Sequence, residues 1–137
     1  MSYNGMDTAK TPHTVLIVED EVLIRMSSAA TLEDAGFRIL EAGNGAEALQ
    51  ILLVNRDIDV LMTDVRLPGE MDGLDLVELV QRNHPAIRSM VVSGTTSAKD
   101  AGNAGALGYL SKPYMAHSLV RAMNKLVQGL APLGRAA

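Results

Sequence analysis

The chain has 137 residues, a formal net charge of -4 and no cysteine. This length suits one compact domain, and the lack of cysteine excludes disulfides, thiolate catalysis and cysteine-based zinc sites. No apolar run is long enough to span a membrane, and the first ten residues lack the pattern of a signal peptide. With no Lys/Arg cluster, three tyrosines, one phenylalanine and no tryptophan, direct binding to nucleic acid is not expected. We therefore expect a soluble, cytoplasmic protein.

The first half of the chain alternates between strand and helix patterns. Residues 1–13 are polar and aperiodic, which predicts a flexible leader. The β-branched run at 14–18 predicts a buried strand, and apolar residues with helical spacing follow as far as Gly36, a candidate helix C-cap. Alternating residues at 37–42 predict a partly exposed strand, after which Asn44 can cap the next helix.

The middle of the chain repeats this alternation. A short apolar run ends at Asp64 and is closed by Pro68, which predicts a third strand buried on both faces, with Asp64 at its carboxyl end. Asp72 can cap a third helix, which must end before Pro85. The apolar run at 87–93 predicts a fourth strand.

The last part of the chain completes five strand and helix units. Residues 97–103 predict a short helix, weakened by Gly102 and by the nearby Gly105. A short strand is expected at 106–110, and an apolar stripe over 115–126 predicts the final helix. Five alternations of this kind imply a parallel sheet between two layers of helices.

In a parallel sheet the carboxyl ends of the strands share one edge, where reacting groups gather. This edge is expected to bring together Glu19, Asp20, Asp64, Ser93 and Lys112. Three neighbouring carboxylates repel one another, so they either raise the pKa of one of them or hold a cation, and oxygen ligands of this kind suit Mg²⁺. A serine hydroxyl and a lysine ammonium can neutralise the oxygens of a phosphoryl group. The set therefore predicts a carboxylate, Asp64, that receives a phosphoryl group.

Each of these residues also has a plainer interpretation. Glu19 and Asp20 could form the acidic first turn of a helix, Ser93 could simply end a strand, and Lys112 could be a solvated loop residue. The three histidines, His13, His84 and His117, have no ligand spacing and are predicted to lie at the surface. Four other aspartates are predicted to be turn or capping residues: Asp57, Asp59, Asp72 and Asp75.

Four motifs, taken in order, make the chain resemble a response-regulator receiver domain of two-component signalling. They are Val18-Glu19-Asp20-Glu21; Thr63-Asp64-Val65-Arg66-Leu67-Pro68 followed by Met71-Asp72-Gly73; Val92-Ser93-Gly94; and Gly108-Tyr109-Leu110-Ser111-Lys112-Pro113. The resemblance implies a flavodoxin-like, doubly wound α/β fold with five parallel strands in the order 2-1-3-4-5. It also implies a receiver domain at 14–130, a tail at 131–137 and no output domain.

The resemblance also implies a role for each site residue. Asp64 would be the phosphoacceptor, and Glu19, Asp20, Asp64 and the backbone carbonyl of Arg66 would hold Mg²⁺. Ser93 and Lys112 would contact the phosphoryl oxygens.

Further residues would act around this centre. Tyr109 would be the aromatic switch that moves inward with Ser93. Arg66 and Thr95 would flank the phosphoryl group and influence its lifetime, and the bond before Pro113 would be cis.

The resemblance implies a histidine kinase or phosphotransfer protein as donor, a downstream protein target and a possible weak homodimer. The domain would assist its own phosphorylation and dephosphorylation without being a separate enzyme. Two departures from the family pattern stand out: the loop 67–73 is one residue longer than the commonest form, and the spacing from Ser93 to Lys112 is shorter by a few residues, at the weak fourth helix. A constitutive protein-binding module with incidental phosphorylation remains the alternative, and an aspartate-nucleophile phosphatase fits less well.

Overall fold

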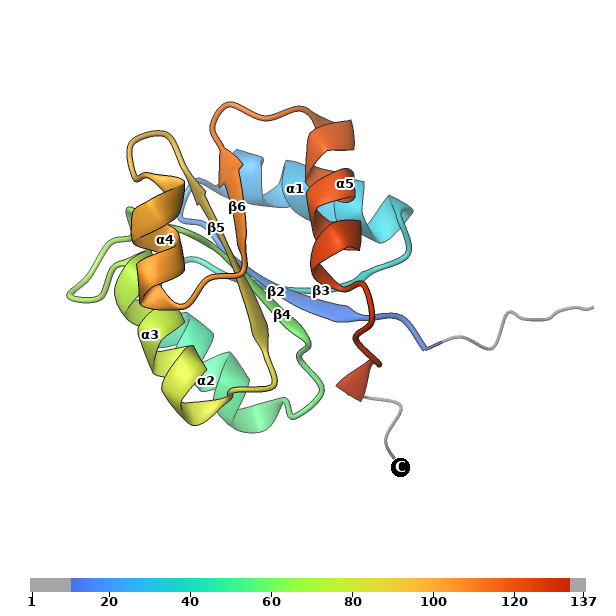
Figure 1. The fold of residues 1–137 in the computed structure, drawn as a ribbon, viewed down its shortest axis with the longest axis horizontal. Helices are drawn as coiled ribbons and strands as arrows, with labels where there is room; N and C mark the ends of the chain where they lie inside the picture. Colours follow the sequence, from blue (N-terminus) through green and yellow to red (C-terminus); the bar gives the residue numbers. More distant parts are fainter. Residues whose placement is uncertain (1–10, 134–137) are drawn as a thin grey trace, which may run out of the picture.

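The computed structural model describes residues 11–133. The first ten residues of the predicted leader and residues 134–137 of the predicted tail lie outside this range. Five parallel strands form one sheet in the order β3-β2-β4-β5-β6, which is 2-1-3-4-5 when these strands are counted along the chain. Helices cover both faces of the sheet (Figure 1). The predicted doubly wound α/β fold is confirmed.

The strands are short and rich in aliphatic and β-branched residues, as a covered parallel sheet requires. Every residue of the central strand β2 is buried, whereas the edge strand β3 exposes Arg38 and Glu41. The carboxyl ends of all five strands lie at one edge, from which the functional residues project. The strands are β2 (Thr14–Val18), β3 (Arg38–Ala42), β4 (Val60–Asp64), β5 (Arg88–Ser93) and β6 (Gly108–Ser111).

Local capping fixes where several helices begin. The Asn44 side chain accepts a hydrogen bond from a backbone amide in the first turn of α2, and Asp72 and Asp75 form a reciprocal capping box on α3. Within residues 11–133, no helix has the length and apolar character needed to cross a membrane. The helices are α1 (Val22–Asp34), α2 (Gly45–Val54), α3 (Gly73–Asn83), α4 (Ala98–Ala104) and α5 (Ala116–Leu126).

The fourth helix is short, as predicted. It begins at the Ser97 cap and has seven residues, with Gly102 in its interior. Gly105 ends it with φ +114°, a left-handed conformation that glycine adopts without steric cost.

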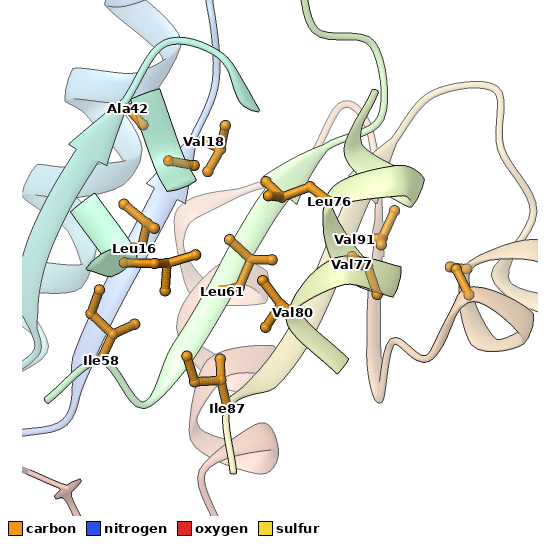
Figure 2. Packing of buried hydrophobic residues seen from close by; sticks show 14 residues of the cluster. Leu16, Val18, Ala42, Ile58, Leu61, Leu76, Val77, Val80, Ile87 and Val91 are labelled. Carbon is orange, nitrogen blue, oxygen red and sulfur yellow. The ribbon is translucent and has the colours of Figure 1, made fainter. Parts of the chain in front are cut away.

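Two hydrophobic clusters bind the helices to the sheet. One lies between the sheet and α2, α3 and α4, and in it Leu61 of β4 lies between Leu16 of β2 and Leu76 of α3 (Figure 2). The other lies between the sheet and α1 and α5, and it includes Ile17, Leu32 and Met123. Because successive strand residues point to opposite faces, the apolar run of β2 feeds both clusters.

At the amino edge of the sheet, residues of the predicted leader and tail contact the rest of the domain. His13, the last leader residue, is half-buried, and its Nε2 lies 2.6 Å from the carbonyl oxygen of Leu130. Asp59, predicted to be a turn residue, is fully buried and accepts hydrogen bonds from the amides of Thr14 at 2.8 Å and Leu133 at 2.6 Å. A buried carboxylate needs such partners, so Asp59 joins the two ends of the described chain.

Two element boundaries differ from the sequence predictions. The sequence pattern places Phe37 in the second strand, but the Phe37 amide donates to the Leu32 carbonyl at 3.0 Å and so completes the turn after α1. The last strand was expected at 106–110, whereas β6 spans Gly108–Ser111. The Ala106 amide donates to the Ala101 carbonyl at 3.0 Å, which ties Ala106 to the end of α4.

Candidate functional site

Four charged residues from three strand ends meet at the carboxyl edge of the sheet. Glu19 and Asp20 follow β2, Asp64 ends β4 and Lys112 follows β6. Carboxylate oxygens of the three acidic residues all lie within 4.8 Å of one another. Glu19 is buried, Asp64 is half-buried and Asp20 is exposed, so the cluster opens to solvent on the Asp20 side.

Lys112 supplies the positive charge at the centre of this cluster. Its Nζ donates to Asp64 Oδ2 at 2.9 Å and to Glu19 Oε1 at 3.0 Å. Burial by itself would lower the pKa of Lys112, but the hydrogen bonds to Asp64 and Glu19 and their negative charges together outweigh it and hold the pKa above its ordinary value. Lys112 therefore stays charged and offsets part of the repulsion between the carboxylates.

Glu19 is the most firmly held member of the acidic group. Burial raises its pKa, against the lowering effects of the Glu21 backbone amide and of Lys112. The Glu21 amide donates to Oε2 at 3.1 Å, and the backbone amide of Glu19 donates to the Ala42 carbonyl at 3.0 Å. Both carboxylate oxygens and the backbone amide of Glu19 therefore have protein partners.

Arg25 of α1 is a supporting residue that the sequence interpretation missed. Its Nη1 donates to the Glu19 carbonyl oxygen at 2.8 Å, and its Nε donates to Glu41 Oε1 at 3.0 Å. The guanidinium thus joins two segments: the turn that contains Glu19 and Asp20, and the edge strand β3. Its helical position gave no local signal of this role, since the contact depends on how α1 lies against the sheet.

Asp64 is placed by a close approach between the end of β4 and the start of α3. The Gly73 amide donates to the Val65 carbonyl at 2.7 Å. A Cβ atom on Gly73 would overlap the Asp64 carbonyl oxygen, so any larger residue must displace the backbone of Asp64. Thr63 Oγ1 also donates to this carbonyl at 2.8 Å.

Ser93 lies near the cluster, but its hydroxyl faces the loop that follows it. The residue is buried, and its Oγ accepts hydrogen bonds from the amides of Thr95 at 3.1 Å and Thr96 at 2.9 Å. The Lys112 amide donates to the Ser93 carbonyl at 3.0 Å, which joins the ends of β5 and β6. The structure therefore places Ser93 at the site without engaging its hydroxyl with the charged groups.

Tyr109 contacts the same loop. Its hydroxyl donates to the Thr96 carbonyl at 2.5 Å and lies 3.5 Å from the Ser93 carbonyl. Ser93 and Tyr109 are thus joined through residues 93–96.

The remaining predicted residues lie around the rim of the site. Arg66 and Thr95 are exposed, two residues beyond Asp64 and Ser93 respectively. Their influence on a phosphoryl group stays a prediction. The Lys112–Pro113 bond is cis, as expected.

The acidic cluster fits a divalent cation of the Mg²⁺ type. Its donors are hard carboxylate oxygens, and their mutual spacing lets one ion contact several of them. Mg²⁺ usually keeps several water ligands, for which the solvent-facing side at Asp20 leaves room. The charge balance also favours a cation, because one lysine cannot neutralise three carboxylates.

Comparison with known proteins identifies the family. The family model of the response regulator receiver domain matches residues 15–124. The chain belongs to this family. The receiver domain is 35% identical over 122 residues to the transcriptional regulatory protein PdtaR of Mycobacterium tuberculosis, covering 87% of this chain and 58% of that protein. It is 34% identical over 119 residues to the sensor kinase CckA of Brucella abortus, covering 84% of this chain but only 12% of that protein.

Solved structures resemble the receiver domain over nearly their whole length. A putative response regulator from Chloroflexus aurantiacus is 30% identical with a TM-score of 0.79, covering 86% of this chain and 99% of that one. The chemotaxis response regulator CheY4 of Vibrio cholerae is 29% identical with a TM-score of 0.78, covering 85% and 99%. These neighbours share the fold, whereas the curated relatives above extend well beyond the part matched here.

Proposed function

We propose that this receiver domain accepts a phosphoryl group on Asp64 and relays a signal through protein contacts. The donor would be a histidine kinase or a phosphotransfer protein. The observation that carries this proposal is the Lys112 ammonium, which binds Asp64 and Glu19 together inside the carboxylate cluster. An aspartate at a strand end, with a fixed cation beside it, is suited to receive a phosphoryl group and to balance the new charge.

The transfer itself is a single displacement at phosphorus. A bond forms between an Asp64 carboxylate oxygen and phosphorus, while the bond between phosphorus and a ring nitrogen of the donor histidine breaks. That nitrogen keeps the electron pair and takes up a proton. Lys112 would then contact the phosphoryl oxygens, and the domain would assist this reaction without a separate catalytic unit.

Mg²⁺ would be held by Glu19, Asp20, Asp64 and the backbone carbonyl of Arg66. When bound, the ion supplies positive charge that neutralises the phosphoryl oxygens. The protein's own part is to keep the carboxylates together despite their repulsion, which Lys112 and the hydrogen bonds to Glu19 support.

Ser93 and Tyr109 would form the response to phosphorylation. A Ser93 hydroxyl that swings toward a phosphoryl oxygen would give up the hydrogen bonds that it accepts from the amides of Thr95 and Thr96. The loop is then free to rearrange, and Tyr109 would follow because its hydroxyl is bound to the Thr96 carbonyl. Phosphorylation would thus shift the population between two arrangements of residues 93–96.

An exposed apolar surface beside the site supports the proposed protein partner. Leu23 is 81% exposed, Met115 67%, Met26 56% and Val22 52%. Val22, Leu23 and Met26 lie in the first two turns of α1, and Met115 directly precedes α5. Leu23 lines the same groove as Lys112. Exposed large apolar side chains beside a site are typical of a docking surface.

A phosphoryl mimic tests this function. We expect beryllofluoride with Mg²⁺ to shift the NMR amide signals of Asp64, Ser93 and Lys112 in the wild type. An Asp64→Asn variant should give no shift with the mimic, whereas an Asp57→Asn control should respond like the wild type. Equal responses from the wild type and Asp64→Asn would contradict the assignment. Equal affinity of the wild type for its protein partner with and without the mimic would instead favour a constitutive binding module.

A further inference from the structure

A small cavity lies behind the acidic cluster. It has a volume of about 10 Å³, and the polar residues that line it are Glu19, Asp64, Ser28 and Tyr114. A space of this size has room for about one water molecule, so these four polar residues are near neighbours. Neither Ser28 nor Tyr114 has a role in the proposed phosphotransfer.

The two hydroxyl groups form a bond that joins distant parts of the chain. Ser28 Oγ lies 2.6 Å from the Tyr114 hydroxyl oxygen. Ser28 is a buried residue of α1, and Tyr114 is half-buried two residues after Lys112, in the loop between β6 and α5. This hydrogen bond joins that loop to α1.

The same pair also lines a much larger groove on the outer side. This groove has a volume of about 590 Å³ and is bounded by Leu23, Pro113 and Lys112 as well as by Ser28 and Tyr114. The hydroxyl pair therefore stands between the inner cavity at the carboxylates and the open groove.

We propose that Ser28 and Tyr114 are positioning residues that hold the Lys112 loop against α1 and so keep the ammonium between Asp64 and Glu19. On one side of Lys112, the backbone is fixed by its amide bond to the Ser93 carbonyl at 3.0 Å. On the other side, the Tyr114 hydroxyl provides the second fixed point. Lysine has a flexible side chain, so two fixed points reduce the freedom that must be lost when the ammonium contacts a phosphoryl oxygen. This inference rests on the proposed function.

Single-hydroxyl deletions and their combination test the proposal. Tyr114→Phe and Ser28→Ala each remove one hydroxyl with little change of shape, and the double variant completes a cycle. Beryllofluoride affinity in Mg²⁺ should fall about 3- to 10-fold in each single variant, which is the usual effect of one hydrogen bond. The double variant should be no worse than the single ones, because the two groups share one bond. Ser27→Ala, at the neighbouring serine that also lines the groove, is the matched control.

Two further readouts separate positioning from general stability. Affinity for Mg²⁺ alone should stay within about twofold of the wild type, since the carboxylates that bind the ion are unchanged and Lys112 keeps its charge. The ¹H–¹⁵N signal of the Lys112 ammonium, sharp when its ion pairs hold it, should broaden in Tyr114→Phe.

Several outcomes overturn the proposal. The first is that the single variants keep wild-type affinity for the mimic and an unchanged ammonium signal. The second is that the losses add up in the double variant. The third is that Mg²⁺ affinity falls as much as beryllofluoride affinity. Failure of the wild type itself to bind the mimic would instead contradict the proposed function.

Discussion

Replacing Lys112 by methionine should destabilise the domain at neutral pH and less so in acid. The change removes the ammonium that binds both Asp64 and Glu19 but keeps an apolar stem of similar length. The side chains concerned are 23% exposed for Lys112, 13% for Asp64 and 7% for Glu19, so the ion pairs are largely shielded from water. Exposed pairs contribute less than about 1 kcal/mol, whereas removing one partner of a fully buried pair costs about 3 to 5 kcal/mol. For this intermediate burial we expect a loss of about 1 to 3 kcal/mol at pH 7.

The pH dependence follows from the direction of the Glu19 shift. Burial raises the pKa of Glu19 above its ordinary value of 4.5, and Lys112 opposes that rise. Without Lys112 the folded-state pKa must rise further. A carboxyl group with a raised folded-state pKa stabilises the fold fully below the unfolded value, and this contribution is lost as the pH rises through the folded value. Between pH 4.5 and pH 7, the free energy of unfolding should therefore decrease more with rising pH in Lys112→Met than in the wild type.

Urea denaturation followed by circular dichroism measures this effect, since the chain has no tryptophan. The wild type, Lys112→Met and the exposed-surface control Lys125→Met should be compared at pH 5 and pH 7. The control should stay within about 0.5 kcal/mol of the wild type. A Lys112→Met variant that matches the wild type at pH 7, or whose deficit grows towards pH 5, would refute this view of the ion pairs.

Three other changes address the support of the site. Gly73→Ala should lower the free energy of unfolding, measured in urea, by about 2 kcal/mol or more, because the new Cβ overlaps the Asp64 carbonyl. Gly102 has open space around it, so the control Gly102→Ala should be neutral or stabilising. A loss in Gly102→Ala that equals the loss in Gly73→Ala would point to glycine content rather than to this contact. Asp59→Ala should lower the free energy of unfolding by about 1 to 3 kcal/mol, and the amides of Thr14 and Leu133 should then exchange their hydrogens faster. Unchanged protection of these amides would show that the buried carboxylate is dispensable. Asp20→Asn should weaken Mg²⁺ binding by titration yet raise the melting temperature without Mg²⁺, by relieving repulsion; a lower melting temperature would contradict this.

The sequence predicted the parts of the site that depend on strand order. Glu19, Asp20, Asp64 and Lys112 meet because parallel strands end at one edge, and each follows or ends a recognisable apolar run. Alternating strand and helix patterns likewise predicted the sheet and its two helical layers. The short fourth helix was predictable from its glycines.

The supporting contacts could not be predicted in this way. Arg25, Ser28 and Tyr114 are ordinary residues for their positions, and each acts through a partner that the fold brings near, 86 residues away in the case of Ser28 and Tyr114. Asp59 looked like a turn residue because a local pattern does not reveal that the chain end returns to cover it. The second strand begins later than predicted because the Phe37 amide donates to a carbonyl of the preceding helix.

The most direct test of the central claim is the intact mass of the protein after incubation with acetyl phosphate and Mg²⁺. The wild type and an Asp57→Asn control should each gain one phosphoryl group, and Asp64→Asn should gain none. Peptide mapping of the wild type after reduction with borohydride should place the modification at Asp64. Equal incorporation by Asp64→Asn, or a modification mapped to another carboxylate, would contradict the assignment of Asp64 as the phosphoacceptor.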